Sequence, residues 1–268
     1  MLSDEQIERY ARHILLREVG GVGQEKILAA AIRLRGLGPI GCWAASYLAL
    51  AGVGRLALDD RRPIPAGGLL PLVPAGRAGQ RRDLGLAEEI PGFNPDVEVS
   101  TVQPAAVGAS NSSLGDLLAT ASGPLARWGP GAPGMDGVWA WLGAGSGAGA
   151  GVKAGGGDDG SPSPPRSPFP EAQGGGTGFL AVAAGAEAIL GWTDRICPAC
   201  IRENLADPDA PPQDAMAALT GSLVAAALLA AILDPPEGSR GPSQGLVSRG
   251  IAGGQRGLPP CAHGEADG

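Results

Sequence analysis

The sequence predicts an α/β fold: a doubly wound, Rossmann-like and mostly parallel sheet, interrupted by a disordered insertion. Two observations support this. Residues 31–60 run through strand, glycine turn, helix and strand in 30 residues, which is the length of a β-α-β unit and implies parallel strands. The chain also has 46 glycines and 25 prolines, about a quarter of its 268 residues. Because these are concentrated in a few stretches, the folded part is shorter than the chain.

Local patterns predict each element in turn. Ser3 to Gln6 has the spacing of a capping box, so a helix begins there, and its apolar residues form one stripe that ends at Gly20-Gly21. The stripe requires a partner surface. The further elements expected are a short helix over 24–30, a strand over 31–35, a helix over 42–51, a strand over 55–58, a weak helix over 83–90, a strand over 97–102, a strand over 178–182 and a long apolar helix over 216–233.

The composition changes along the chain and divides it into five segments. Residues 143–177 hold 12 glycines and 5 prolines and cannot bury a core of their own. The expected segments are an N-terminal helical arm over 1–30, the nucleotide-binding half of the α/β domain over 31–104, a low-complexity insertion over 105–177, the C-terminal half over 178–235 and a mobile tail over 236–268.

Charge and terminal composition exclude several functional classes. The net charge is −7, which argues against nucleic acid as a partner because binding a phosphate backbone needs clustered lysine and arginine. The acidic N-terminus has no basic region followed by an apolar one, so we expect a cytoplasmic protein. Residues 216–233 are at the lower limit of a membrane span, but Asp214 and Asp234 flank them where basic or aromatic anchors would be expected. We therefore expect a buried helix and no membrane contact.

A glycine motif points to a nucleotide. Gly36, Gly38 and Gly41 have the GxGxxG spacing, follow a strand and open a helix, and Asp60 ends the second strand, where an acid receives ribose hydroxyls. The first two glycines let the backbone approach phosphate, and the helix N-terminus favours its charge. Arg33 and Arg35 interrupt a strand that should be continuously apolar. Either that face is exposed or salt-bridged, or Arg35 contacts phosphate.

The cysteines suggest a structural metal. Cys197 and Cys200 have the spacing of half a zinc site, and Cys261 and His263 are the downstream residues that could complete it as a zinc knuckle clamping the C-terminus. A redox pair, or no site at all, remain alternatives. Cys42 is read as a packing residue where helix meets strand. His13 is the one histidine outside the tail, so the sequence does not favour a mechanism with histidine as general acid or base.

Several stretches resemble the ThiF/MoeB/HesA family, the ubiquitin-activating-enzyme type of adenylyltransferase. The resemblance covers residues 3–102 and 178–235. It is carried by Arg9-Tyr10-x-Arg12-x-Ile14-Leu15-Leu16, the run Gly36-Leu37-Gly38-Pro39-Ile40-Gly41, the run from Tyr47 to Leu56, Asn94-Pro95-Asp96-Val97-Glu98-Val99, the Cys197/Cys200 pair and Gly221-Ser222-Leu223.

The resemblance implies a mechanism and a set of site residues. Such enzymes bind ATP and Mg²⁺, use the C-terminal carboxylate of a ubiquitin-like sulfur carrier to attack the α-phosphate, release pyrophosphate and work as homodimers. It assigns Arg12 to the neighbouring subunit's ATP and Asp60 to the ribose. Arg82 falls where the family has its phosphate-binding lysine, and Cys197 with Cys200 would hold Zn²⁺.

The sequence also departs from the family at several site positions. Two residues after the ribose aspartate the family has a second acid, and here Arg62 replaces it. The family's Asn-Leu-x-Arg stretch is replaced by Gly68-Leu69-Leu70-Pro71. Residues 103–142 contain no match to the family's Asp-x-x-Asp-Asn, although Asp116 and Asp136 are there. We therefore expect ATP-dependent adenylylation of a sulfur carrier's C-terminus with degraded activity. The alternative is an inactive pseudoenzyme that acts as scaffold or partner of an active paralogue or carrier. A nicotinamide-dependent oxidoreductase is a weaker third hypothesis, since no second catalytic domain is seen.

Overall fold

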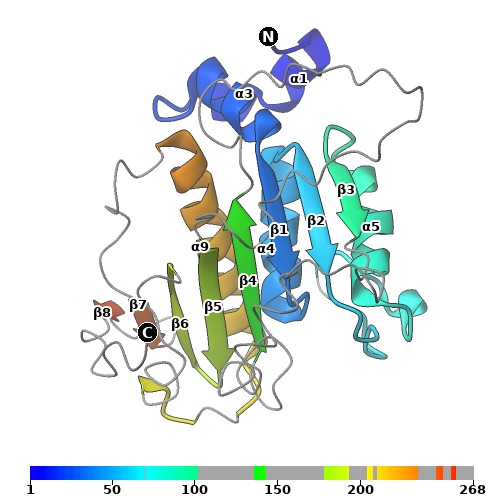
Figure 1. The fold of residues 1–268 in the computed structure, drawn as a ribbon, viewed down its shortest axis with the longest axis vertical. Helices are drawn as coiled ribbons and strands as arrows, with labels where there is room; N and C mark the ends of the chain where they lie inside the picture. The colour runs from blue at the N-terminus through cyan, green and yellow to red at the C-terminus, as the bar shows by residue number, and fades with distance from the viewer. Residues whose placement is uncertain are drawn as a thin grey trace, which may run out of the picture.

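The computed structural model describes residues 1–69, 71–101, 136–142, 178–192, 204–207, 210–234, 246–249 and 255–257. These residues contain one sheet (Figure 1). Its strands are β1 (Ala31–Arg35), β2 (Arg55–Asp59), β3 (Glu98–Thr101), β4 (Asp136–Leu142), β5 (Gly178–Ala184), β6 (Glu187–Trp192), β7 (Leu246–Arg249) and β8 (Gln255–Gly257). They lie in the order β3-β2-β1-β4-β5-β6-β7-β8.

The sheet is parallel at one end and antiparallel at the other. Strands β1, β2 and β3 are parallel neighbours, with Ala31 opposite Arg55 and Arg35 opposite Asp59. From β4 onward every pairing is antiparallel, beginning with β4 against β1. The predicted parallel sheet is therefore correct for 31–101, and the sheet as a whole is mixed.

Three helices form a single layer on the sheet. These are α4 (Pro39–Ala51), α5 (Arg82–Phe93) and α9 (Asp214–Leu233), and α4 packs between the other two. Figure 1 shows them behind the strands. The crossovers β1-α4-β2 and β2-α5-β3 run in the same direction along the sheet, so their common handedness places both helices on one face. Among the described residues no helix covers the opposite face, where a doubly wound fold would have one.

The main core lies between the sheet and this helix layer. Along β1, Ile32 and Leu34 are fully buried while Arg33 and Arg35 are partly exposed, because side chains alternate between the two faces of a strand. The same face continues across β2, β4 and β5, and the helices close it. Fully buried members of this core include Leu56, Leu58, Ile40, Leu48, Leu86, Val138, Ala181, Val224, Leu228 and Ile232.

Three strands lie in segments where the sequence predicts none. Asp136–Leu142 forms β4 in the middle of the sheet, although it falls inside the predicted 105–177 insertion. Leu246–Arg249 and Gln255–Gly257 form β7 and β8 inside the predicted mobile tail. These strands are short and surrounded by glycine and proline, and their partner strands supply the pairing that local patterns do not reveal.

The N-terminal arm is shorter and more broken than the sequence predicts. The capping box at Ser3 forms, but α1 (Asp4–Arg9) ends at Tyr10, α2 (Ala11–Ile14) is one turn, and α3 (Gly20–Ala29) begins at the glycines expected to end the helix. Of the expected apolar stripe, Tyr10 is buried whereas Leu15 is 84% exposed. The stripe therefore does not form. The arm instead docks through Tyr10, through Ile27 in the main core, and through Gln24, whose Nε2 donates to the Ala51 carbonyl at 2.9 Å.

Helix α9 is long and apolar enough to cross a membrane by length and composition. In the structure, half of that stretch is buried, against α4, α3, β5 and β6. Thr220 Oγ1 donates to the backbone carbonyl of Met216 at 2.7 Å, which satisfies its buried hydroxyl within the helix. The prediction of a buried helix thus holds for the face of α9 that packs on the domain.

Candidate functional site

The glycine turn joins β1 to α4 and has a tightly constrained backbone. Gly36 has a φ of 89°, in the left-handed region, and its N–H donates to the Asp59 carbonyl at 3.2 Å. A Cβ on Gly41 would lie 2.1 Å from the Gly36 carbonyl oxygen, so only glycine fits there. Gly38 is the N-cap of α4, and no side chain caps that helix. The turn brings the backbone of 36–38 to the N-terminal end of α4.

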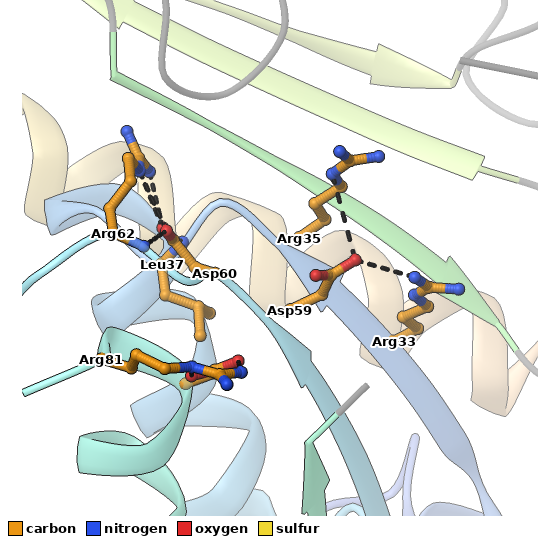
Figure 2. A network of polar contacts seen from close by, with 8 residues as sticks. Arg33, Arg35, Leu37, Asp59, Asp60, Arg62 and Arg81 are labelled. Atoms are coloured by element: carbon orange, nitrogen blue, oxygen red, sulfur yellow. Dashed lines mark hydrogen bonds and ion pairs between the residues drawn. The ribbon is translucent and has the colours of Figure 1, made fainter. Parts of the chain in front are cut away.

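Asp60 follows β2 and reaches back to this turn (Figure 2). The Leu37 N–H donates to its Oδ2 at 2.7 Å. Arg62 also binds the carboxylate, with its backbone N–H 3.0 Å and its Nε 2.9 Å from Oδ1 and its Nη2 2.6 Å from Oδ2. The Asp60 side chain is only 4% exposed. Burial raises the pKa of this carboxyl, but the hydrogen bonds and charge of Arg62 outweigh burial and leave the pKa below its usual value.

The N-terminal end of α5 adds Arg82 beside Asp60 and, one residue earlier, Arg81, which binds Asp83. Arg82 Nη1 lies 3.7 Å from Asp60 Oδ2, and the Arg82 backbone N–H donates to the Arg62 carbonyl at 3.0 Å. Arg81 binds the fully buried Asp83 with two hydrogen bonds, of 3.0 and 2.6 Å, which raise the pKa of its guanidinium. The Asp83 N–H in turn donates to the Asp60 carbonyl at 3.1 Å. The start of α5 is thereby fastened to the segment that carries Asp60.

The two arginines of β1 form a salt-bridged face. Arg33 Nη2 lies 2.8 Å from Asp59 Oδ2, and Arg35 Nε lies 4.0 Å from the same oxygen (Figure 2). Both guanidinium groups come from the face of β1 opposite to the helix layer. The hypothesis of a salt-bridged face is confirmed for these residues, and a phosphate contact of Arg35 stays a prediction.

A second polar cluster fixes the N-terminal arm to the domain. The Tyr10 hydroxyl donates to Asp96 Oδ2 at 2.9 Å and accepts from Asn94 Nδ2 at 2.9 Å, while the same Asn94 amide donates to the Ala49 carbonyl at 2.8 Å. Burial raises the pKa of Tyr10 to about 12. The Arg9–Tyr10 and Asn94–Asp96 motifs thus meet as a structural joint, away from the glycine turn.

The structure brings together five of the residues that the sequence nominates. Gly36, Gly38, Gly41, Asp60 and Arg82 surround the glycine turn. Arg12 is not among them: it is exposed on α2, which belongs to the arm at the other end of β1. Cys42 is fully buried, and its thiol lies 3.3 Å from the Leu69 carbonyl, as expected for a packing residue.

Sequence reasoning missed the role of Arg62. It notes only that an arginine replaces an acid, and it does not predict the ion pair with Asp60. The available signal is the spacing: an aspartate that ends a strand can bind the backbone N–H two residues later, which places the side chain at that position beside the carboxylate.

The described residues do not test the predicted zinc site, and they bear on Mg²⁺ only beside the glycine turn. Cys197, Cys200, Cys261 and His263 lie outside the described residues, so their zinc site stays a prediction. Within the described part of the chain, no group of three or more potential metal ligands is found. Beside the glycine turn, the carboxylates of Asp59 and Asp60 are already paired with arginines. Mg²⁺ is held by one or two carboxylates plus phosphate oxygens. The described side chains therefore do not fit Mg²⁺ as they stand.

Comparisons with known proteins agree with this geometry. A model of the ThiF family matches residues 10–121. Over 99 residues the chain is 42% identical to the adenylyltransferase and sulfurtransferase MOCS3 of Bos taurus, a match that covers 36% of this chain and 22% of the bovine protein. It is 33% identical over 109 residues to the heterocyst protein HesA of Trichormus variabilis, covering 38% of this chain and 39% of HesA. The matched stretch is thus well under half the length of either relative.

The solved structures show the same fold over a larger share of the chain. A crystal structure of PaaA superposes with a TM-score of 0.54 at 15% identity, covering 96% of this chain and 75% of PaaA. At that identity the likeness concerns the fold alone. The matched family model and the two relatives support one conclusion: over residues 10–121 the chain matches the ThiF family.

Proposed function

We propose that the chain is an ATP-dependent adenylyltransferase that activates the C-terminal carboxylate of a ubiquitin-like sulfur carrier, with weakened activity. One observation carries the proposal: Asp60 binds the Leu37 N–H and so ties the end of β2 to the glycine turn at the start of α4. This places a carboxylate, a glycine turn and a helix N-terminus together, as a nucleotide site requires. The name of the bovine relative, an adenylyltransferase, points to the same chemistry.

The proposed reaction is a phosphoryl-site displacement. The carrier's carboxylate oxygen attacks the α-phosphorus of ATP, the bond from that phosphorus to the bridging oxygen breaks, and pyrophosphate leaves with the bonding electrons. The carrier is left as an acyl-adenylate. The uncapped N-terminus of α4 offers its positive dipole end to the phosphates, and Arg82 adds a guanidinium beside the turn. These groups position the phosphates and stabilise their charge; no step is assigned to Mg²⁺.

A homodimer is part of the proposal. Arg12 would then act on the neighbouring subunit's ATP, which accounts for its exposure far from its own glycine turn. The outer side of α4 supports a protein partner, since Tyr47 is 41% and Leu50 51% exposed on it. Sedimentation at micromolar concentration should give a dimer, and Leu50→Glu should shift it toward monomer. A wild-type monomer that adenylates a carrier would contradict this part.

The zinc site is likewise proposed, on Cys197, Cys200, Cys261 and His263. Four such ligands would complete a tetrahedron and clamp the C-terminus. Metal analysis of protein purified without chelator should find one Zn²⁺ per chain. Cys200→Ser should lose that metal, whereas Cys42→Ser, at a buried packing position, should keep it. Wild-type protein without zinc would contradict the assignment.

A pseudoenzyme scaffold is the second candidate, and one observation favours it. The Asp60 carboxylate, which is expected to bind ribose, already accepts hydrogen bonds from Arg62. The chain therefore loses a nucleotide contact at Asp60 in addition to those lost where family residues are replaced. A scaffold would keep the carrier-binding surface without the reaction. It should bind a carrier equally well with and without ATP.

The deciding experiment measures ATP binding by calorimetry and ATP–pyrophosphate exchange with a carrier that ends in Gly-Gly. We expect saturable ATP binding, weakened at least tenfold in Asp60→Ala because the Leu37 N–H loses its partner. Asp59→Ala is the matched control: it removes the neighbouring carboxylate, which binds Arg33, and should bind ATP nearly as well as the wild type. If the wild type fails to bind millimolar ATP but binds the carrier, the scaffold replaces the enzyme.

A further inference from the structure

We infer that Arg62 makes the nucleotide site indifferent to the ribose hydroxyls, so that ribonucleotides and 2′,3′-dideoxynucleotides bind it equally. This inference rests on the proposed function, because it concerns the substrate class of the same site. In it, Asp60 anchors the glycine turn and Arg62, and it is not the group that selects a ribose.

The first step is the hydrogen-bonding capacity of Asp60. An ionised carboxylate has about four acceptor positions, two on each oxygen. Oδ1 accepts from the Arg62 backbone N–H at 3.0 Å and from its Nε at 2.9 Å. Oδ2 accepts from the Leu37 N–H at 2.7 Å and from Arg62 Nη2 at 2.6 Å. The chain itself thus fills all four positions, and a ribose hydroxyl needs one of them.

The second step is access. The Asp60 side chain is almost completely buried, whereas that of Arg62 is 34% exposed. The solvent-accessible part of this ion pair is therefore the Arg62 side chain. Figure 2 shows its guanidinium directly against the Asp60 carboxylate. A sugar that approaches from solvent meets Arg62 before it meets Asp60.

The third step compares the two partners for the carboxylate. Arg62 is cationic and binds with a planar fork, the strongest kind of hydrogen-bonded pair, and Arg82 adds a second cation 3.7 Å from Oδ2. A ribose hydroxyl is neutral. An exchange would replace two charge-assisted contacts with one weaker contact and separate a partly buried ion pair. The equilibrium therefore favours Arg62.

The fourth step is the backbone of Arg62, which limits how far the side chain can move aside. Its N–H is held by Asp60 Oδ1, and its carbonyl accepts from the Arg82 N–H at 3.0 Å. Both sides of the residue are fixed, one by the strand end and the other by the start of α5. The ion pair is thus built into the connection between β2 and α5.

The test compares ATP with 2′,3′-dideoxy-ATP by calorimetry in three proteins. In the wild type we expect the two Kd values to agree within about twofold. In Arg62→Ala, Asp60 regains two acceptor positions, and ATP should bind at least tenfold more tightly than the dideoxynucleotide. Arg61→Ala is the matched control: it removes the same charge from an exposed neighbouring residue and should behave like the wild type. Should Arg62→Ala fold poorly, Arg62→Met keeps the aliphatic stem.

The outcomes separate this inference from the proposed function. A tenfold preference for ATP in the wild type overturns it, as does an Arg62 variant that still binds both nucleotides equally. A wild type that binds neither nucleotide contradicts the adenylyltransferase and the claim of equal binding. An Arg62 variant that then binds ATP in preference to the dideoxynucleotide would still show that Arg62 occupies the carboxylate that would otherwise bind ribose. Absence of binding in all three proteins overturns both.

Discussion

Tyr10 shows at the scale of one residue how burial changes an ionisation. Its hydroxyl sits between Asn94 and Asp96, and burial raises its pKa to about 12. The unfolded value is about 10. Because the folded pKa is higher, the stability contributed by neutral Tyr10 is fully present below pH 10 and is lost as the pH rises toward 12.

The chain has two tyrosines, and this makes the prediction easy to measure. In Tyr47→Phe, the absorbance of tyrosinate should appear near pH 12 and coincide with loss of stability in urea. In Tyr10→Phe, the loss of urea stability between pH 10 and pH 12 should be absent. A Tyr10 midpoint near pH 10 in folded protein would show that the hydroxyl is not held as described.

Gly41 provides the second prediction at this scale. Gly41→Ala would place a methyl group 2.1 Å from the Gly36 carbonyl oxygen, so the turn must shift. We expect a loss of about 1–3 kcal/mol in the free energy of unfolding. Gly21→Ala, which meets nothing within 4 Å at the start of α3, should instead be neutral or stabilise by up to about 1 kcal/mol. Equal urea midpoints for the two variants would contradict the geometry.

At the scale of elements, the contact between α4 and α9 depends on one small residue. A Cβ on Gly221 would lie 2.5 Å from the Trp43 Cβ and 2.7 Å from the Ile40 carbonyl oxygen. Gly221→Val should therefore separate the helices and cost about 1–3 kcal/mol, measured by urea unfolding. Ala226→Val, on the exposed side of the same helix, controls for helix propensity and should change stability much less. A similar cost in both variants would point to propensity rather than to packing.

The elements also show what local sequence can predict. The capping box at Ser3 and the β1-α4-β2 unit rest on neighbouring residues, and both form as expected. The prediction for the N-terminal arm is wrong because its apolar spacing suggests a stripe. In the structure Tyr10 makes polar contacts with residues more than eighty positions away, which local spacing does not report. Strand β4 is not predicted for the same reason, because it is stabilised by pairing with β1, about a hundred positions earlier in the chain.

The candidate site divides in the same way. Gly36, Gly38, Gly41 and Asp60 follow from a spacing that backbone geometry requires, so the sequence nominates them and the structure brings them together. The pairing of Arg62 with Asp60 depends on how the chain turns after β2, which composition and periodicity do not report. Zinc ligation by residues 197–263 stays a prediction.

For the molecule as a whole, β4 and β5 form a hairpin whose connection is far longer than its geometry needs. Trp141 lies opposite Gly178, so the ends of residues 143–177 meet at neighbouring positions of the sheet. Antiparallel strands can be joined by two to five residues. Replacing 143–177 with a four-residue turn should leave the fold intact and stabilise it by about 2 kcal/mol, since loop closure then costs less.

Circular dichroism and urea unfolding test this replacement, and ATP titration asks whether the site survives. A loop of the same length with scrambled sequence is the control and should match the wild type in stability. If the shortened protein unfolds while the scrambled one stays folded, the C-terminal end of β4 and the N-terminal end of β5 do not meet as the register requires.

The junction of parallel and antiparallel strands at β1 also has a consequence during synthesis. Residues 31–101 can form β1, β2 and β3 as soon as they leave the ribosome, but the other edge of β1 pairs with β4, which begins at Asp136. At about 5–20 residues per second, residues 102–135 take roughly 2–7 seconds to translate. For that time the nascent chain presents an unpaired strand edge, the feature that invites aggregation and chaperone capture. Slow codons within this stretch should therefore lower the soluble yield, and fast ones should raise it.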